Sequence, residues 1–345
     1  MKHFLILSFV LFSVWISSAQ TGGTTTFSLL DLSYNARSTA LGTDFISIKD
    51  KDLNLGVSNP SLYNSTMDKQ FSFNQALLAG GINYGMVNYA KSLDSNRTVS
   101  GNIRYINYGE MVRRDEAGVD LGTFRPAEFI FGVGGAKQIN PYLSVGTNVN
   151  LLYSQLASYS SLGVAVDIAG TYYNKKKQFL VTALVKNAGL QLKKYTTENK
   201  EILPVEFQMA VSYKLEHAPF RFSLLGHHLN TWDITYVDPT IQPTTDPLTG
   251  ELVPIVLPSF MEKLGRHFTY QVELLLTKSF NLRFAYDYQR RQEMKLEQRP
   301  GVAGFSFGVG LNFKRLNIDY GLAVFSASGF NNMLTLRTDL SKWKK

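Results

Sequence analysis

The 345-residue sequence contains no cysteine. Structural disulfides, thiolate metal sites and a thiol nucleophile are therefore all excluded. A bacterial lipid anchor is excluded as well, because it requires a cysteine at the signal-peptide cleavage point. If this protein lies in a membrane, its own fold must hold it there.

Long apolar runs are also scarce. Outside the N-terminal segment no stretch of eighteen apolar residues occurs, which excludes a helical membrane protein. The N-terminal segment has a basic start at Lys2, an apolar core over residues 4–16 and a small-residue end at Ser17-Ser18-Ala19. This pattern predicts a secretory signal peptide over residues 1–19.

The excess of basic residues does not indicate a nucleic-acid partner. The net charge is +8 at pH 7, but a chain predicted to be exported does not meet nucleic acid. A basic rim can instead contact the phosphates and carboxylates of lipopolysaccharide in the outer leaflet. Outer-membrane lipid and lipopolysaccharide are therefore the partners expected from charge.

From about Gln70 to the C-terminus, apolar and polar residues alternate over successive segments. In one of them, Phe305 and Phe307 alternate with Ser306 and Gly308. A membrane β-barrel requires this pattern, because lipid contacts every second side chain and the lumen contacts the others. The expected strands are 70–78, 82–92, 98–110, 125–138, 142–158, 161–174, 179–192, 206–217, 220–236, 267–279, 281–291, 303–314, 316–326 and 331–341.

The expected number of strands is fourteen, and closed antiparallel barrels made of one bacterial chain have an even number of strands. If the N-terminus is periplasmic, connections after odd-numbered strands face outward, and all the long connections follow odd strands. They are 111–124, 193–205, 237–266 and 292–302. The sequence therefore predicts an all-β, 14-stranded antiparallel transmembrane β-barrel over residues 68–345, in the outer membrane of a Gram-negative bacterium. The last strand is expected to close against the first.

Residues 20–67 differ from the rest of the chain. Residues 33–42 are typical of a short helix closed by Gly42, and residues 58–63 of a turn or a second short helix. The segment is too short to build its own core. It is therefore predicted to be a plug or cap with short helices, held by the barrel.

The longest connection, residues 237–266, contains five prolines, which prevent strand formation. It also carries an apolar run at residues 255–257. Two interpretations remain open: a semi-rigid loop folded over the barrel mouth, and a docking surface for another protein. The residues proposed for docking are Pro243, Pro247, Ile255, Val256, Leu257 and Phe260.

The sequence offers no recognisable catalytic, cofactor-binding or metal-binding pattern. His227 and His228 are adjacent, and adjacent residues of a regular strand point to opposite faces, so they are not expected to bind one ion. Asp115, Glu116 and Asp120 lack the spacing of an EF-hand. The protein is therefore expected not to be an enzyme and to need no cofactor or metal.

Two glycine-rich stretches, Gly132-Val133-Gly134-Gly135 and Gly308-Val309-Gly310, resemble phosphate loops only superficially. Both lie in predicted strands, and no helix follows whose N-terminus could bind a phosphate. They are interpreted as inward-facing glycines that make room for a neighbouring backbone or for the plug.

Charges on the predicted inward faces nearly balance in sign. An ion-selective porin favours charge of one sign, whereas a balanced set indicates ion pairs that close the lumen. Arg37, Asp50 and Asp52 of the plug can join such a network. Its proposed members are Arg104, Glu128, Asp167, Lys186, Arg221, Glu273, Arg283, Asp287, Asp319, Arg337 and Asp339.

The N-terminal motifs Asn35-Ala36-Arg37-Ser38-Thr39-Ala40-Leu41-Gly42 and Asn59-Pro60-Ser61-Leu62 resemble those of the long-chain fatty-acid transporter superfamily of fourteen-stranded barrels. Within it the chain is most similar to the PorQ family of the type IX secretion system. Stretches 105–110, 115–124, 158–163, 186–189 and 217–222 carry this finer resemblance. The motif residues are Asn35, Ala36, Arg37, Gly42, Asn59 and Pro60.

This resemblance implies a non-enzymatic role in the attachment complex that joins secreted cargo to lipopolysaccharide. The barrel would anchor a PorZ-like surface protein, beside a PorU-like sortase and a PorV-like barrel. The alternative, suggested by the wider superfamily, is a transporter of hydrophobic small molecules across the outer membrane. That role requires an apolar pocket near the plug and a lateral gap in the wall, for which the glycine-rich strand around Gly132–Gly135 is the candidate.

Overall fold

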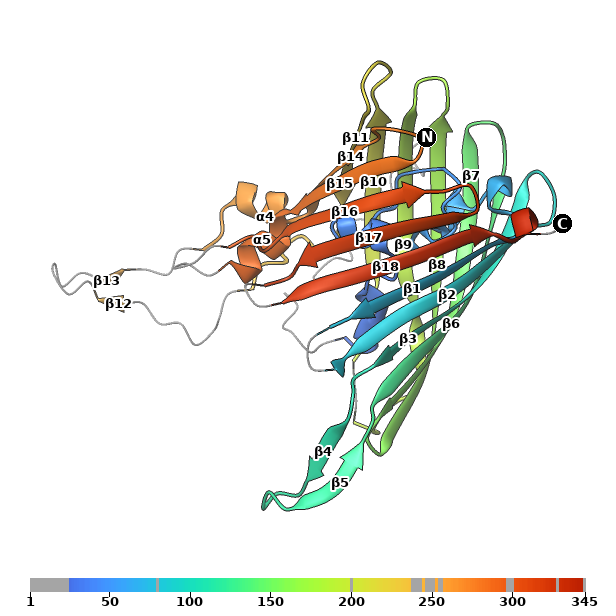
Figure 1. Cartoon of the computed structure of the whole chain (residues 1–345). Helices are drawn as coiled ribbons and strands as arrows, with labels where there is room; N and C mark the ends of the chain where they lie inside the picture. Colours follow the sequence, from blue (N-terminus) through green and yellow to red (C-terminus); the bar gives the residue numbers. More distant parts are fainter. Residues whose placement is uncertain are drawn as a thin grey trace, which may run out of the picture.

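The computed structural model describes residues 25–78, 81–198, 201–236, 244–245, 252–253, 257–295, 301–326 and 329–343. These residues form a closed barrel of fourteen antiparallel strands (Figure 1). The strands are β1 (Gln70–Leu77), β2 (Asn83–Ser92), β3 (Arg97–Asn107), β6 (Ala127–Gln138), β7 (Leu143–Leu156), β8 (Tyr159–Asn174), β9 (Phe179–Lys193), β10 (Glu206–Lys214), β11 (Phe220–Gly226), β14 (Phe268–Leu274), β15 (Phe280–Asp287), β16 (Phe305–Asn312), β17 (Leu316–Val324) and β18 (Phe330–Asp339).

The strands follow from the two-residue period of the sequence. Along β3, Val99 and Ile103 are exposed on the outer face, whereas Ser100, Asn102 and Arg104 are buried on the inner face. An apolar outer face and a polar inner face are what lipid on one side and a filled lumen on the other require. The predicted fold class is therefore confirmed.

Closure occurs between the first and last strands. β18 pairs with β1 from Gln70–Asp339 to Leu77–Asn332, as the sequence predicts. Closure leaves no strand edge with unpaired N–H and C=O groups, which would be costly in hydrocarbon. Strand order around the wall follows the sequence, so all connections after odd-numbered barrel strands emerge at one end.

The predicted connection 111–124 lies outside the barrel wall, and it has secondary structure of its own. It contains β4 (Met111–Arg114) and β5 (Asp120–Phe124), which pair as a hairpin that projects beyond the barrel (Figure 1). The turn between them suits the sequence, since Gly118 adopts φ 82° and its N–H donates to the Asp115 carbonyl at 3.0 Å. Asp115 thus shapes a turn.

Three predicted strands end several residues too late. β11 ends at Gly226 rather than 236, β14 ends at Leu274 rather than 279, and β15 ends at Asp287 rather than 291, where α5 (Tyr288–Met294) begins. The Asp287 carboxylate accepts a hydrogen bond from the Arg290 N–H at 3.0 Å, an N-cap that starts the helix. The predicted loop 237–266 contains α4 (Phe260–Arg266) and the two-residue pair of β12 (Thr244–Thr245) with β13 (Leu252–Val253).

The N-terminal segment fills the lumen as short helices. They are η1 (Ser28–Asp31), α2 (Ala36–Ala40), α3 (Leu55–Ser58), η2 (Pro60–Leu62) and η3 (Ser65–Met67), and η5 (Leu340–Trp343) follows the last strand. In Figure 1 the blue plug elements lie among the strands of the barrel. Leu41, Phe45, Leu55 and Leu62 of the plug pack together with Leu180 of the wall.

Among the residues that the structure describes, no helix is long and apolar enough to span a membrane.

Helix α2 packs against the wall where glycines leave space. A Cβ at Gly321 would lie 2.1 Å from the Ala36 carbonyl oxygen, and one at Gly308 would lie 2.3 Å from the Ala40 Cβ. On β6, a Cβ at Gly134 would lie 3.0 Å from the ring of Tyr63 in the plug. Of the predicted glycines, Gly134 and Gly308 thus leave space for the plug. A Cβ at Gly132 or Gly310 would meet polar side chains of the wall instead, and Gly135 faces outward, so the prediction of an inward glycine is wrong there.

We expect Gly321→Val to displace α2, because the added side chain overlaps the plug backbone. The expected cost is about 1–3 kcal/mol, seen as a lower temperature for the folded-to-unfolded band shift in gel electrophoresis and as faster proteolysis of the plug. Gly101→Val is the control, because a Cβ there meets nothing within 4 Å on the outer face of β3. Equal behaviour of the two variants would contradict the packing.

Candidate functional site

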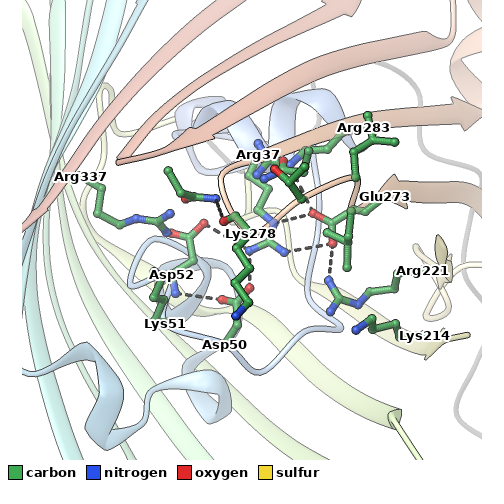
Figure 2. Close-up of a pocket in the computed structure, with 15 residues that line it drawn as sticks. Arg37, Asp50, Lys51, Asp52, Lys214, Arg221, Glu273, Lys278, Arg283 and Arg337 are labelled. Atoms are coloured by element: carbon green, nitrogen blue, oxygen red, sulfur yellow. Dashed lines mark hydrogen bonds and ion pairs between the residues drawn. The ribbon is translucent and has the colours of Figure 1, made fainter. Parts of the chain in front are cut away.

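The plug is tied to the wall by a buried arginine. Arg37 of α2 donates from Nε to Glu273 Oε1 of β14 at 2.8 Å and from Nη2 to Oε2 at 3.0 Å. The remaining nitrogen, Nη1, lies 2.7 Å from Asp50 and 3.5 Å from Asp52. Figure 2 shows the guanidinium between these plug carboxylates and Glu273. A fork-shaped pair of this kind fixes both distance and orientation.

The wall extends this contact into a network. Glu273 also accepts from Arg221 at 2.7 Å and from Arg283 at 3.3 Å. Arg283 pairs with Asp319 at 2.7 Å, and Arg337 links Asp319 at 3.6 Å to Asp52 of the plug. The connected group is Arg37, Arg221, Arg283, Arg337, Asp50, Asp52, Glu273 and Asp319, with equal numbers of each sign.

Burial makes the pairing obligatory. The side chains of Arg37 and Glu273 are 6% and 2% exposed, and an unpaired charge at such a place costs several kcal/mol. At Asp50, burial alone would raise the pKa, but the Arg37 guanidinium outweighs this effect and holds the pKa below its usual range. A cavity of about 480 Å³ adjoins the network and is also lined by Lys51, Lys214 and Lys278 (Figure 2).

A second polar contact joins the plug to β9 and β10. Lys186 lies 3.3 Å from Asp44 of the plug, and Gln208 donates to the same carboxylate at 3.1 Å. Nearby, Asp167 accepts from the Asn187 N–H at 2.8 Å, where the β8–β9 register shifts and Asn187 adopts φ 59°. This bulge turns buried polar groups of the wall toward one another.

The other members of the predicted network lie apart from the group around Glu273. Arg104 and Asp167 are bridged by the Asn150 side chain. Glu128 accepts from Tyr108 at 2.8 Å. Asp287 caps α5, and Asp339 lies near Lys342 at 3.7 Å at the end of the last strand. The structure thus brings together Arg221, Glu273, Arg283, Asp319 and Arg337 and leaves the other six elsewhere.

The residues of the two N-terminal motifs build the plug. Asn35 caps α2 by accepting from the Ser38 N–H at 2.8 Å, and the Ala36 N–H donates to Thr335 of β18 at 2.8 Å. Gly42 adopts φ 89°, close to Thr269. Asn59 donates to the Ile46 carbonyl at 2.8 Å and to Thr182 at 2.9 Å, and Pro60 begins η2 against Gly146.

Part of the lumen is apolar, which the sequence analysis missed. Inward side chains of the wall pack with the start of the plug in one buried cluster, whose wall members include Tyr84, Met86, Ile106, Ile130 and Leu152. The plug members include Phe27, Leu29, Leu30 and Tyr34. These wall positions share the parity of the buried polar residues on their strands, so parity combined with hydrophobicity could have revealed them.

The prediction that His227 and His228 point to opposite faces is wrong. The strand ends at Gly226, and His228 adopts φ 53°, so the regular alternation no longer applies. The two Nδ1 atoms lie 2.8 Å apart, and the rings meet edge to face. Glu206, another residue missed from the sequence, accepts from the His228 N–H at 3.0 Å.

The predicted docking residues are only partly described. Leu257 and Phe260 are 68% and 64% exposed, and the Phe260 ring lies 5.1 Å from that of Trp232. Pro243, Pro247, Ile255 and Val256 lie outside the described residues.

The sequence matches no protein-family model and no curated protein. The fold is similar to the toluene transporter TbuX of Ralstonia pickettii, with a TM-score of 0.52, 12% identity and coverage of 90% of this chain and 99% of that chain. It is also similar to the toluene transporter TodX of Pseudomonas putida, with a TM-score of 0.51, 11% identity and coverage of 89% of this chain and 96% of that chain. For the CymD monoaromatic hydrocarbon channel the TM-score is 0.50 and the identity 11%, and the coverage is 90% of this chain and 97% of that chain.

At these identities the similarity concerns the fold alone. The chain has the fold of an outer-membrane β-barrel of fourteen strands, as the superfamily resemblance implies. These similarities do not support the PorQ family in particular.

We expect Glu273→Gln to loosen the plug, because three guanidinium groups lose the carboxylate that they share. Breaking a buried pair costs about 3–5 kcal/mol. In planar bilayers the wild-type barrel should not conduct like a general porin, whereas the variant should show frequent open events. Glu110→Gln is the control, because its pair with Arg125 is exposed. Porin-level conductance of the wild type, or a silent Glu273→Gln variant, would contradict the role of the network.

Proposed function

We propose that this barrel carries a small hydrophobic molecule across the outer membrane through its plugged lumen. One observation carries the proposal: the inward apolar wall of Tyr84, Met86, Ile106, Ile130 and Leu152. A pore for water or ions has no need of such a wall, whereas a site for a small hydrophobic ligand is lined mainly by apolar and aromatic side chains. TbuX and TodX, which share the fold, are described as toluene transporters.

The start of the plug covers this wall. Phe27, Leu29 and Leu30 are almost fully buried against it. Their backbone is joined to the barrel near Ile202, whose carbonyl accepts from the Thr26 N–H at 2.9 Å. A hydrophobic molecule would compete with these side chains for the same apolar surface. Passage therefore requires displacement of residues 27–30, while the network around Glu273 can stay in place.

The prediction of a lateral gap around Gly132–Gly135 is wrong. β6 pairs without a register shift with β3 on one side and with β7 on the other throughout this stretch. An entry at the barrel mouth fits better, because the partly buried Leu78, Ile82 and Tyr108 extend the apolar cluster toward the end that carries the odd-numbered connections.

We expect Phe27→Ala to bind toluene about tenfold more tightly than the wild type, because removal of the ring leaves an apolar cavity of a size that accepts such a ligand. Ile130→Asn should weaken binding. The measurement is equilibrium dialysis of radiolabelled toluene against purified protein, corrected for empty micelles.

The matched control is Phe131→Ala, the neighbouring residue of β6, whose ring is exposed on the outer face. If Phe27→Ala, Ile130→Asn and Phe131→Ala all bind toluene like the wild type, the lumen is not the binding site and the proposal fails.

We also propose a second candidate, an anchor for a surface protein, which the exposed apolar group on α4 favours. Phe260 and Met261 are 64% and 70% exposed beside Trp232. The group is held in place because Lys263 donates to Asp233 at 2.6 Å, a hydrogen bond that lowers the pKa of Asp233 to about 2. A PorZ-like protein, with PorU-like and PorV-like components, is the partner that the sequence resemblance implies.

For this anchor, the double substitution Phe260→Asp and Met261→Asp should abolish co-purification of the surface partner from gently solubilised outer membranes, without affecting toluene binding. Leu93→Asp is the control, since it places a charge at an exposed residue of the β2–β3 connection at the other end of the barrel. Retention of a partner by the double variant, identified by mass spectrometry, would exclude docking at α4.

A further inference from the structure

The end of β11 and the start of β10 bring three metal-binding side chains together. His227 Nδ1 and His228 Nδ1 lie 2.8 Å apart, and Glu206 Oε1 lies 3.4 Å from His228 Nδ1. All three ligand atoms lie within 4.8 Å of one another. The arrangement depends on the left-handed backbone of His228, which turns its ring back toward that of His227.

We propose that His227, His228 and Glu206 bind one divalent transition-metal ion of the zinc class. Two imidazole nitrogens and one carboxylate oxygen are a ligand set that Zn²⁺ uses, with bonds of about 2.0–2.2 Å that place neighbouring ligand atoms roughly 3 Å apart. Imidazole ligands also suit Ni²⁺ and Cu²⁺, whereas Mg²⁺ and Ca²⁺ prefer oxygen. Small movements of side chains that already converge suffice to form the site.

The surroundings favour a cation. A cavity of about 200 Å³ adjoins the three ligands and is also lined by Asp31, Asp44 and Asp287. The positive charges nearby have carboxylate partners, Lys186 with Asp44 and Arg290 with Asp287. The cavity leaves room for water to complete the coordination of the ion.

The ring of His227 also carries an unsatisfied polar atom. His227 is 7% exposed, and its Nε2 has no hydrogen-bond partner among the described residues. A buried nitrogen without a hydrogen-bond partner is unfavourable. An ion on Nδ1 requires the tautomer with the proton on Nε2, which makes Nε2 a donor, the role that the second ring nitrogen of a metal-bound histidine usually has.

The alternative is a purely structural histidine pair, in which one Nδ1–H donates to the other Nδ1. Such a pair needs no cation, and it predicts no saturable metal binding. The proposal is independent of toluene transport, because it concerns ligands at the end of β11 and not the apolar wall.

The test is titration of purified, chelator-treated, full-length barrel in detergent with Zn²⁺, followed by calorimetry, and with Co²⁺, followed by visible absorption. We expect one saturable site per chain and d–d bands typical of nitrogen and oxygen ligands. Mg²⁺ at the same concentrations should give no binding. The absence of saturable Zn²⁺ binding to the wild type would overturn the proposal.

Three variants localise the site. His228→Ala and Glu206→Gln should each weaken Zn²⁺ binding about tenfold or more, and the side chain of His228 is 44% exposed, so its removal should leave the barrel folded. His217→Ala, an exposed histidine in the β10–β11 connection, is the matched control and should bind as the wild type does. Binding that depends on His217 but not on His228 or Glu206 would reject the site.

Discussion

The ion pair between Arg37 and Glu273 determines where the plug lies inside the barrel. Its members are 236 positions apart in the sequence, and both are buried. If the two side chains separate, each leaves an unpaired charge buried away from water. Since Glu273 also holds Arg221 and Arg283, a movement of α2 would disturb β11 and β15 as well. Plug and wall therefore specify each other's positions.

Along β2 and β3 the inward residues form a polar zone and an apolar zone. On β3 the inward residues run from Ser100 and Asn102 through Arg104 to Ile106, and on β2 they run from Asn88 to Met86 and Tyr84. The apolar zone thus lies toward the end with the odd-numbered connections. On these two strands, a hydrophobic molecule that enters there would meet Tyr84 and Ile106 before Arg104. The plug supplies matching residues to both zones, Phe27 and Leu29 to one and Arg37 to the other.

The sequence predicts what depends on periodicity. Alternation over each strand gives the number of strands, their closure and the inward side of residues such as Arg283 and Asp319. The partner of a given inward charge depends on strand register and on the path of the plug, and neither has a local signal. Asp44 lies in an irregular stretch of the plug, so nothing in the sequence marks it. Glu206, by contrast, shares the parity of the inward Gln208, so the alternation along β10 also predicts that it faces inward.

Attachment and transport make different demands on the inside of this barrel. A scaffold for a surface protein requires only that the lumen be filled, and its partner would be recognised by the outer connections. Transport requires that a ligand can displace part of the plug. Separating the apolar side chain of Phe27 from the apolar wall costs less free energy than separating Arg37 from Glu273. A metal ion at His227, His228 and Glu206 would sit beside Asp44 and Asp31 of the plug. It would add a link between the start of β10 and the end of β11 that a chelator can break, whereas the ion pairs around Glu273 would remain. Residues 27–30, which make apolar contacts, would then be the part of the plug that a ligand displaces, and Arg37 would keep the rest in place through its ion pairs.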